Sequence, residues 1–264
     1  MTDQLSENDI KLGRIVTEEQ GHVFLIGIDR PAKLNGFTNK MCNELAQAYT
    51  DYEAGPWRCA LVYSTGKHFT AGLDLQNIDR AVDLFPKELV DPVGLYPPLR
   101  SKPVVAAVRG ITFTIGFEIA LGADIIIAGS DARIAQLEVK RSLMPTCGGT
   151  ARMIERAGWG NAMRYLLTGD EFNAKDAYRM GFVQEVVDPE AVFDRALVVA
   201  NKVADQAPLA VQAVLANGRK LVDEGMDAAT VELSEKSAAL RDTNDVKEGL
   251  ASFIERRKAN YTGT

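Results

Sequence analysis

Residues 110–128 read GITFTIGFEIALGADIIIA, and this stretch decides the fold class. Behind Gly116, residues 117–121 predict the start of a helix, and residues 125–128 predict a buried strand. Residues 103–108, PVVAAV, form another short β-branched run of the kind that is buried on both faces of a sheet. Strands that alternate with a helix in this way predict an α/β fold with parallel strand pairing.

The segment before this stretch continues the same pattern. Residues 14–17 and 23–29 predict a β-hairpin around Glu19-Gln20-Gly21, and residues 58–64, RCALVYS, predict a further strand. Between them, residues 39–53 carry apolar side chains at helical spacing and are followed by a Gly-Pro pair, which is a typical helix stop.

The chain changes character after about Cys147, where nearly every segment has helical periodicity. Helices are predicted over residues 191–205, 209–224, 228–241 and 245–257. We expect a core of residues 1–200, followed by a C-terminal helical oligomerisation region over residues 201–264. Residues 78–102 are rich in proline and irregular, and a loop of that length inside a compact domain is often functional.

Composition narrows the classes of protein to consider. The 264 residues carry a formal net charge of -6, which argues against sequence-independent nucleic-acid binding. The three cysteines, Cys42, Cys59 and Cys147, form no CxxC pair, so we expect reduced thiols and no structural zinc site. The polar, acidic N-terminal residues do not resemble a signal peptide, and no apolar run has the length of a membrane span. A cytoplasmic protein is expected.

Two glutamates are candidate catalytic residues. Glu118 lies on an otherwise apolar helix, where a carboxyl group is costly without a partner or a role, and a structural ion pair is the alternative. Glu138 lies next to Lys140 and Arg141, so a surface ion pair is its alternative. Asp74 is explained as well by a capping role as by a ligand role. No catalytic triad and no strand-following G-x-G-x-x-G is recognised, which disfavours serine hydrolases and nicotinamide enzymes.

Four motifs occur in a fixed order along the chain. They are RPAKLNGF (residues 30–37), FTAGLDL (69–75), the stretch quoted above, and ARIAQLEVKRSLMPTCGGTARM (132–153). In this order and at these intervals they resemble the crotonase (enoyl-CoA hydratase/isomerase) family, and the tail FIERRKANY also looks like the family's final helix. The matching positions are Arg30, Pro31, Asn35, Phe69, Ala71, Gly72, Asp74, Gly116, Glu118, Ala120, Glu138, Pro145, Gly148 and Gly149. The resemblance implies the family's spiral of ββα units with a C-terminal helical region.

The resemblance also implies a catalytic site. The backbone N–H groups of Ala71 and Ile115 would hold the enolate oxygen of a thioester, and loss of one such donor typically costs about 3 kcal/mol of transition-state stabilisation. The family often has glycine at the position of Ile115, whose bulk is expected to narrow the pocket. Glu118 and Glu138 would be the proton-handling pair. We assign water activation mainly to Glu118 and protonation of the α-carbon mainly to Glu138, and expect their titrations to be coupled.

Coenzyme A needs a site for its adenine and phosphates. By resemblance, the candidate binding residues come from two segments and the C-terminal end of the chain. They are Ala32, Lys33 and Leu34; Phe69, Ala71, Gly72, Leu73 and Asp74; and Lys258. Lys33 is a candidate phosphate partner, and Lys258 resembles a lysine that reaches the CoA of a neighbouring subunit. The family implies homotrimers, commonly paired into hexamers.

The predicted activity is hydration of a trans-2-enoyl-CoA to a 3-hydroxyacyl-CoA, without a metal or an organic cofactor. Family members that only move a double bond commonly lack one of the two glutamates, so the presence of both favours a hydratase over an isomerase. Isomerisation, thioester hydrolysis and weakly catalytic acyl-CoA binding remain the alternatives. The sequence leaves acyl-chain length and branching open.

Overall fold

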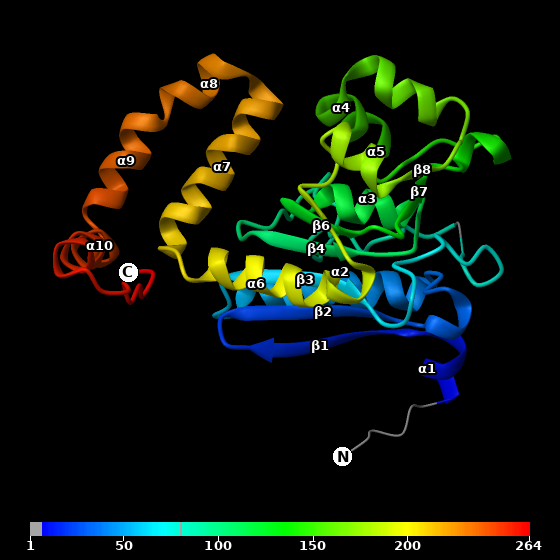
Figure 1. Ribbon diagram of the computed structural model, residues 1–264, viewed down its shortest axis with the longest axis horizontal. Helices are drawn as coiled ribbons and strands as arrows, with labels where there is room; N and C mark the ends of the chain where they lie inside the picture. The colour runs from blue at the N-terminus through cyan, green and yellow to red at the C-terminus, as the bar shows by residue number, and fades with distance from the viewer. Residues whose placement is uncertain (1–6, 80) are drawn as a thin grey trace.

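A six-stranded sheet forms the centre of the computed structural model, which describes residues 7–79 and 81–264 (Figure 1). Residues 1–6 of the polar N-terminal segment, and Arg80 within residues 78–102, lie outside the described residues. In spatial order the strands are β1 (Arg14–Gln20), β2 (Val23–Asp29), β3 (Cys59–Ser64), β4 (Val104–Val108), β6 (Ile125–Gly129) and β9 (Glu185–Val187). β1 is antiparallel to β2, and the other neighbours pair in parallel, which confirms the α/β prediction.

Helices cover both faces of this sheet and bury alternate side chains of its strands. α2 (Asn39–Ala54) and α3 (Ile115–Gly122) contribute to one apolar cluster, and α6 (Val192–Ala204) contributes to the other. Along β4, Val104, Ala106 and Val108 belong to the first cluster, whereas Val105 and Ala107 belong to the second. The strand is therefore buried on two faces, as its continuous apolar sequence predicts.

A smaller sheet lies next to α3. It contains β5 (Ile111–Phe113), β7 (Arg133–Ala135) and β8 (Phe172–Asn173), with β5 parallel to β7 and β8 antiparallel to β7. The remaining helices before α6 are α1 (Glu7–Leu12), α4 (Gly149–Leu166) and α5 (Ala174–Arg179). Short 3-10 turns, η1 (Pro31–Lys33), η2 (Glu138–Arg141) and η3 (Pro189–Ala191), connect these elements.

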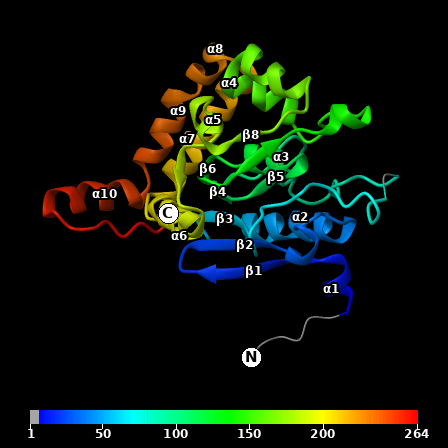
Figure 2. The ribbon, with the colours of Figure 1, turned by 45° about the vertical axis from the view of Figure 1, so that its right-hand side comes forward.

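The C-terminal helices leave the body of the molecule as an arm (Figures 1 and 2). They are α7 (Pro208–Glu224), α8 (Met226–Val231), α9 (Leu233–Arg241) and α10 (Asn244–Glu255). α6 spans residue 201 and packs on the sheet, and the division of the chain at residue 200 stays a prediction. Among the described residues, no helix combines the length and the hydrophobicity that crossing a membrane requires.

Several element boundaries differ from the sequence prediction. β1 continues to Gln20, so the hairpin turn is Gly21-His22 and lies later than predicted. The single helix predicted over residues 228–241 is two helices, which meet at Glu232. β8 and β9 lie in the part of the chain that was predicted to be nearly all helical. These strands have two and three residues, which is too short for a strand periodicity to be visible.

Candidate active site

Glu118 lies on the first turn of α3 with only 2% of its surface exposed. Its Oε1 accepts hydrogen bonds from the backbone N–H groups of Cys147 at 2.8 Å and Gly149 at 2.9 Å. Within residues 7–79 and 81–264, no protein group donates to its Oε2. One carboxylate oxygen is therefore fixed by the start of α4, and the other is available to a water or a substrate.

Burial raises the pKa of Glu118 to about 7. The hydrogen bond from Gly149 opposes this rise, the nearby negative charge of Glu138 adds to it, and the bond from Cys147 and the positive charge of Arg152 oppose it. A carboxyl group with a pKa near neutrality can take up and release protons at the pH of a cell. The carboxyl group has backbone donors and no ion-pair partner in the described part of the chain, so the structural alternative for Glu118 has no support.

Glu138 begins η2 rather than lying in a loop, and it is half-buried. The Gln136 side-chain amide is placed in the orientation that satisfies its hydrogen-bond partners. In this orientation its nitrogen donates to both carboxylate oxygens of Glu138, at 3.2 Å each. Burial raises the pKa of Glu138, and the charge of Arg141 opposes the rise. Neither Lys140 nor Arg141 forms an ion pair with Glu138 in the part of the chain that the structure describes, which argues against a surface ion pair.

Both carboxyl groups are held around Gly149. A Cβ atom added to Gly149 would lie 3.0 Å from Oε1 of Glu118 and 2.5 Å from the amide of Gln136, which in turn contacts Glu138. The charge of Glu138 raises the pKa of Glu118, as expected for two carboxyl groups that titrate together. The structure thus brings together the two glutamates that were selected from the sequence.

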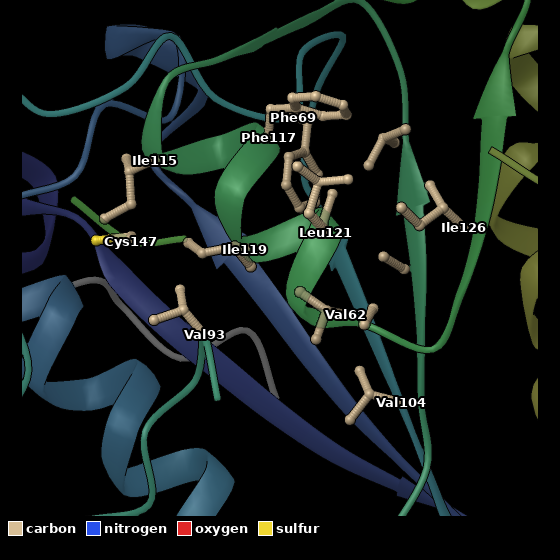
Figure 3. Close-up of a cluster of buried hydrophobic side chains, with 14 of the residues drawn as sticks. Val62, Phe69, Val93, Val104, Ile115, Phe117, Ile119, Leu121, Ile126 and Cys147 are labelled. Carbon is tan, nitrogen blue, oxygen red and sulfur yellow. The ribbon is translucent and has the colours of Figure 1, made fainter. Parts of the chain in front are cut away.

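The N-terminus of α3 carries free backbone donors beside this pair, and the N–H of Ile115 is the first of them. α3 begins at Ile115, two residues earlier than predicted. The Ile115 N–H therefore has no carbonyl within the helix to which it could donate. Thr114 before it has φ 51° and ψ -121°. Within the described ranges, the Ile115 N–H donates to no protein acceptor. The Ile115 side chain is buried in the core beside Cys147, not in the open pocket that its bulk was expected to narrow (Figure 3).

The segment of residues 70–73 lies against this helix start. The N–H of Phe113 donates to the carbonyl of Thr70 at 3.0 Å, and residues 70 and 112 form a parallel bridge. A Cβ atom on Gly72, which has φ +106°, would lie 2.3 Å from Oγ1 of Thr114. The backbone around Gly72 therefore approaches the N-terminus of α3 as closely as a glycine permits.

The prediction that Ala71 supplies the second oxyanion donor is wrong. The Ala71 N–H donates to the carbonyl oxygen of Leu34 at 2.9 Å and is not available to a ligand. Two residues later, the Leu73 N–H donates to no acceptor among the residues that the structure describes. Leu73 was named only as a CoA-binding residue, and no side-chain signal distinguishes its N–H from that of Ala71.

The two predicted CoA-binding segments lie side by side, joined by the bond between Ala71 and Leu34. Ala32 and Lys33 lie in η1, and both are exposed, as is Leu34, which has φ 51°. The buried amide of Asn35 donates to the carbonyls of Thr65 at 2.9 Å and His68 at 2.8 Å, which fixes this turn against the next loop.

The side chains of Phe69 and Asp74 contact other parts of the protein itself. The Phe69 side chain is fully buried in the core next to Phe117 (Figure 3), so it offers no surface to a ligand. Asp74 accepts hydrogen bonds from Arg30 at 2.8 Å and from the N–H of Gln76 at 3.2 Å. Burial disfavours the charged form of Asp74, but the bonds from Arg30 and its neighbours outweigh this and lower its pKa.

Lys258 lies beyond the end of α10, not on the helix as predicted. Its Nζ forms an exposed ion pair with Asp205 of the same chain at 2.8 Å. The prediction that it reaches the ligand of a neighbouring subunit stays a prediction. Within the described ranges, no three His, Cys, Asp or Glu side chains are grouped so that they could hold a metal ion.

Comparison with known proteins agrees with this geometry. Residues 18–264 match the family model described as enoyl-CoA hydratase/isomerase. A mitochondrial enoyl-CoA hydratase of Pongo abelii is 33% identical over 94% of this chain and 87% of its own length, and a short-chain-enoyl-CoA hydratase of Clostridium acetobutylicum is 31% identical over 94% and 97%. A crystal structure of a probable enoyl-CoA hydratase/isomerase from Mycobacterium abscessus superposes with a TM-score of 0.91 at 41% identity, covering 96% of this chain and 100% of that chain. The chain therefore belongs to the enoyl-CoA hydratase/isomerase family and has the crotonase fold.

Proposed function

We propose that this protein is an enoyl-CoA hydratase, which adds water across the 2,3 double bond of a trans-2-enoyl-CoA to give a 3-hydroxyacyl-CoA. The observation that carries the proposal is the pair Glu118 and Glu138, held around Gly149 beside the unused N–H groups of Leu73 and Ile115. Relatives that are named enoyl-CoA hydratases support it.

The proposed step begins from the pair carrying a single proton, in the form in which Glu118 is ionised and the proton is on Glu138. The Oε2 of Glu118 takes a proton from a water molecule while the water oxygen bonds to the β-carbon. The electrons of the double bond move onto the thioester oxygen, and the enolate then takes a proton at its α-carbon from Glu138. Glu118 ends the step protonated and Glu138 ionised, and exchange with the next water resets both groups.

The N–H groups of Leu73 and Ile115 are the proposed donors to the enolate oxygen. The Ile115 N–H also points out of the N-terminus of α3, where the helix dipole favours negative charge. Donors of this kind are fixed before the reaction, so they stabilise developing charge without a reorganisation cost. Since the donors and both proton-handling groups belong to the chain, the proposed reaction needs no metal or organic cofactor beyond the CoA of the substrate.

Two carboxyl groups favour hydration over the alternatives. Moving a double bond along the chain requires one group that removes a proton and returns it, whereas hydration requires water activation and α-carbon protonation at separate positions. The placement of two carboxyl groups with raised pKa values around Gly149 supplies both.

Loss of conjugated absorbance on incubation with a trans-2-enoyl-CoA tests the proposal. We expect turnover by the wild type and by Glu155→Gln, which changes an exposed carboxyl group on α4, and a loss of at least a hundredfold in kcat for Glu118→Gln. Absence of hydration with short, medium and long enoyl-CoA substrates would contradict the hydratase assignment. If Glu118→Gln turned over as fast as the wild type, the proposed role of Glu118 would be contradicted and the hydratase assignment would stand.

The CoA moiety is proposed to lie along the joined segments of residues 32–34 and 71–73, with the ammonium group of the exposed Lys33 near a phosphate. Lys33→Ala is expected to raise KM with little change in kcat, because the lysine contacts only the part of the substrate that does not react.

A homotrimer or homohexamer in the cytoplasm is the proposed working form. Support for assembly comes from large apolar side chains that one chain leaves exposed on α8 and α10, namely Val231 (81%), Phe253 (84%) and Ile254 (78%). The three cysteines are unpaired thiols, which suits a reducing compartment. Sedimentation equilibrium of the full chain tests the assembly, and a monomer would contradict it.

A further inference from the structure

A cavity of about 520 Å³ adjoins the segment that binds Glu118. The side chain of Cys147 lines it, and the backbone N–H of the same residue donates to Glu118. Val93, which also lines it, lies on the same side of α3 as Cys147 and Ile115 (Figure 3). An enoyl chain that continues beyond Glu118 would therefore enter this cavity past Cys147.

Apart from Thr146, the rest of the wall comes from residues 83–97, and it is mostly apolar. Leu84, Phe85, Val93 and Leu95 supply much of it. Burial raises the pKa of the Cys147 thiol, so this side chain is neutral and behaves as a small apolar group.

The inner part of this wall is held in place by Asp91. Its carboxylate accepts hydrogen bonds from the N–H groups of Val93 at 3.0 Å, Leu95 at 2.8 Å and Tyr96 at 2.9 Å. Arg152 donates to the carbonyl of Gly94 at 3.1 Å and fixes the same turn. The cavity is thus preformed rather than created by an entering ligand.

The charges that line the cavity disfavour an anionic tail. Asp91 is buried and ionisable, and its oxygens already accept backbone hydrogen bonds. The ammonium group of Lys87 is paired with Asp83 at 2.9 Å. Among the described lining residues, therefore, two carboxyl groups face one ammonium group, and that ammonium group is already paired.

We propose that this cavity receives the acyl tail, and that the preferred substrates are uncharged enoyl-CoA thioesters with tails longer than the four-carbon crotonyl group. The proposal rests on the proposed hydratase function and adds the substrate class to it. A crotonyl group has a single methyl beyond its β-carbon and leaves the cavity unfilled. Each further methylene that moves from water to an apolar wall strengthens binding by about fourfold.

Steady-state kinetics with four substrates test the proposal on the full-length protein. We expect kcat/KM for trans-2-octenoyl-CoA to exceed that for crotonyl-CoA by at least tenfold. At equal chain length, kcat/KM for trans-2-hexenoyl-CoA is expected to exceed kcat/KM for 2,3-dehydroadipyl-CoA, which ends in a carboxylate, by at least tenfold. Equal or higher values for crotonyl-CoA or for dehydroadipyl-CoA would overturn the proposed substrate class and leave the hydratase function standing.

Two variants in the loop that contains residues 82 and 84 test whether the cavity causes the preference for longer acyl chains. Leu84→Trp fills part of the cavity and is expected to lower the octenoyl-to-crotonyl ratio of kcat/KM at least fivefold. Val82→Trp adds the same side chain at an exposed position outside the lining and is expected to leave that ratio unchanged. An unchanged ratio in Leu84→Trp would place the acyl tail elsewhere. Absence of hydration with all four substrates would instead overturn the hydratase function itself.

Discussion

The Glu118→Gln substitution is expected to stabilise the folded protein above pH 7, although it removes a group that the proposed reaction needs. Burial raises the pKa of Glu118 from 4.5 to about 7, so the folded protein keeps a proton that the unfolded chain has already lost. Because the folded state binds more protons in this window, its free energy of unfolding falls as the pH rises from about 4.5 to about 7. Above pH 7 the free energy of unfolding no longer changes because of this group.

The size of the effect follows from these two pKa values. A tenfold change in proton affinity corresponds to about 1.4 kcal/mol, which gives a loss of about 3 kcal/mol across the window. Glu118 is only 2% exposed, so solvent screening reduces this little. Glutamine is neutral at every pH and keeps an oxygen that can accept the N–H groups of Cys147 and Gly149, so the variant does not lose this stability.

Urea unfolding at one protein concentration and at pH 5, 6, 7 and 8 measures the difference between variant and wild type. We expect the free energy of unfolding of Glu118→Gln, relative to that of the wild type, to increase progressively with pH, by about 2.5 kcal/mol from pH 5 to pH 8. Glu155→Gln, on the exposed side of α4, controls for the loss of a surface carboxyl group. A difference that is the same at every pH would refute the raised pKa, and with it the reasoning that Glu118 accepts a proton near neutrality.

Three further predictions concern catalysis. The kcat/KM of the wild type is expected to show a bell-shaped pH profile, because the step needs a single proton on the pair Glu118 and Glu138, and a flat pH profile would contradict this. Glu138→Gln is expected to lower kcat by about a hundredfold or more with a smaller change in KM, as measured by hydration of an enoyl-CoA. Gly72→Ala, whose Cβ would lie 2.3 Å from Oγ1 of Thr114, is expected to lower kcat at least tenfold and to cost about 1–3 kcal/mol of stability. Gly160→Ala has no heavy atom within 4 Å of its Cβ and is expected to retain activity and stability in the same assays.

Long elements with a clear periodicity were predictable from the sequence, and short ones were not. The buried strand β4 and the amphipathic α2 have the predicted type and nearly the predicted bounds, because burial on two faces or on one stripe constrains every residue. β9 has three residues, and its place beside β6 depends on pairing with a distant strand. The break between α8 and α9 at Glu232 carries no proline or glycine that would mark it.

The candidate catalytic side chains were predictable mainly from their motifs, and for Glu118 the chemistry of the helix adds a second signal. A carboxyl group on the apolar α3 is costly, so Glu118 could be selected before its donors were known. The sequence did not reveal those donors, since Cys147 and Gly149 contribute only backbone N–H groups from a distant segment. Gln136, whose amide contacts both oxygens of Glu138, was also missed. A buried glutamine two residues before a candidate acid is a signal that could have found it.

The backbone donors are the hardest part of such a site to predict, because any residue but proline supplies an N–H and only its direction matters. In a regular extended segment, the N–H groups of residues two apart point to the same side. The φ of +106° at Gly72 turns the backbone between Ala71 and Leu73, which breaks this rule. The Ala71 N–H donates to the carbonyl of Leu34, whereas the Leu73 N–H has no acceptor among the described residues. The other proposed donor, on Ile115, likewise follows a residue of positive φ, the non-glycine Thr114 at 51°. Two unusual backbone conformations thus aim both donors, and strain of this kind persists only where the surrounding structure enforces it.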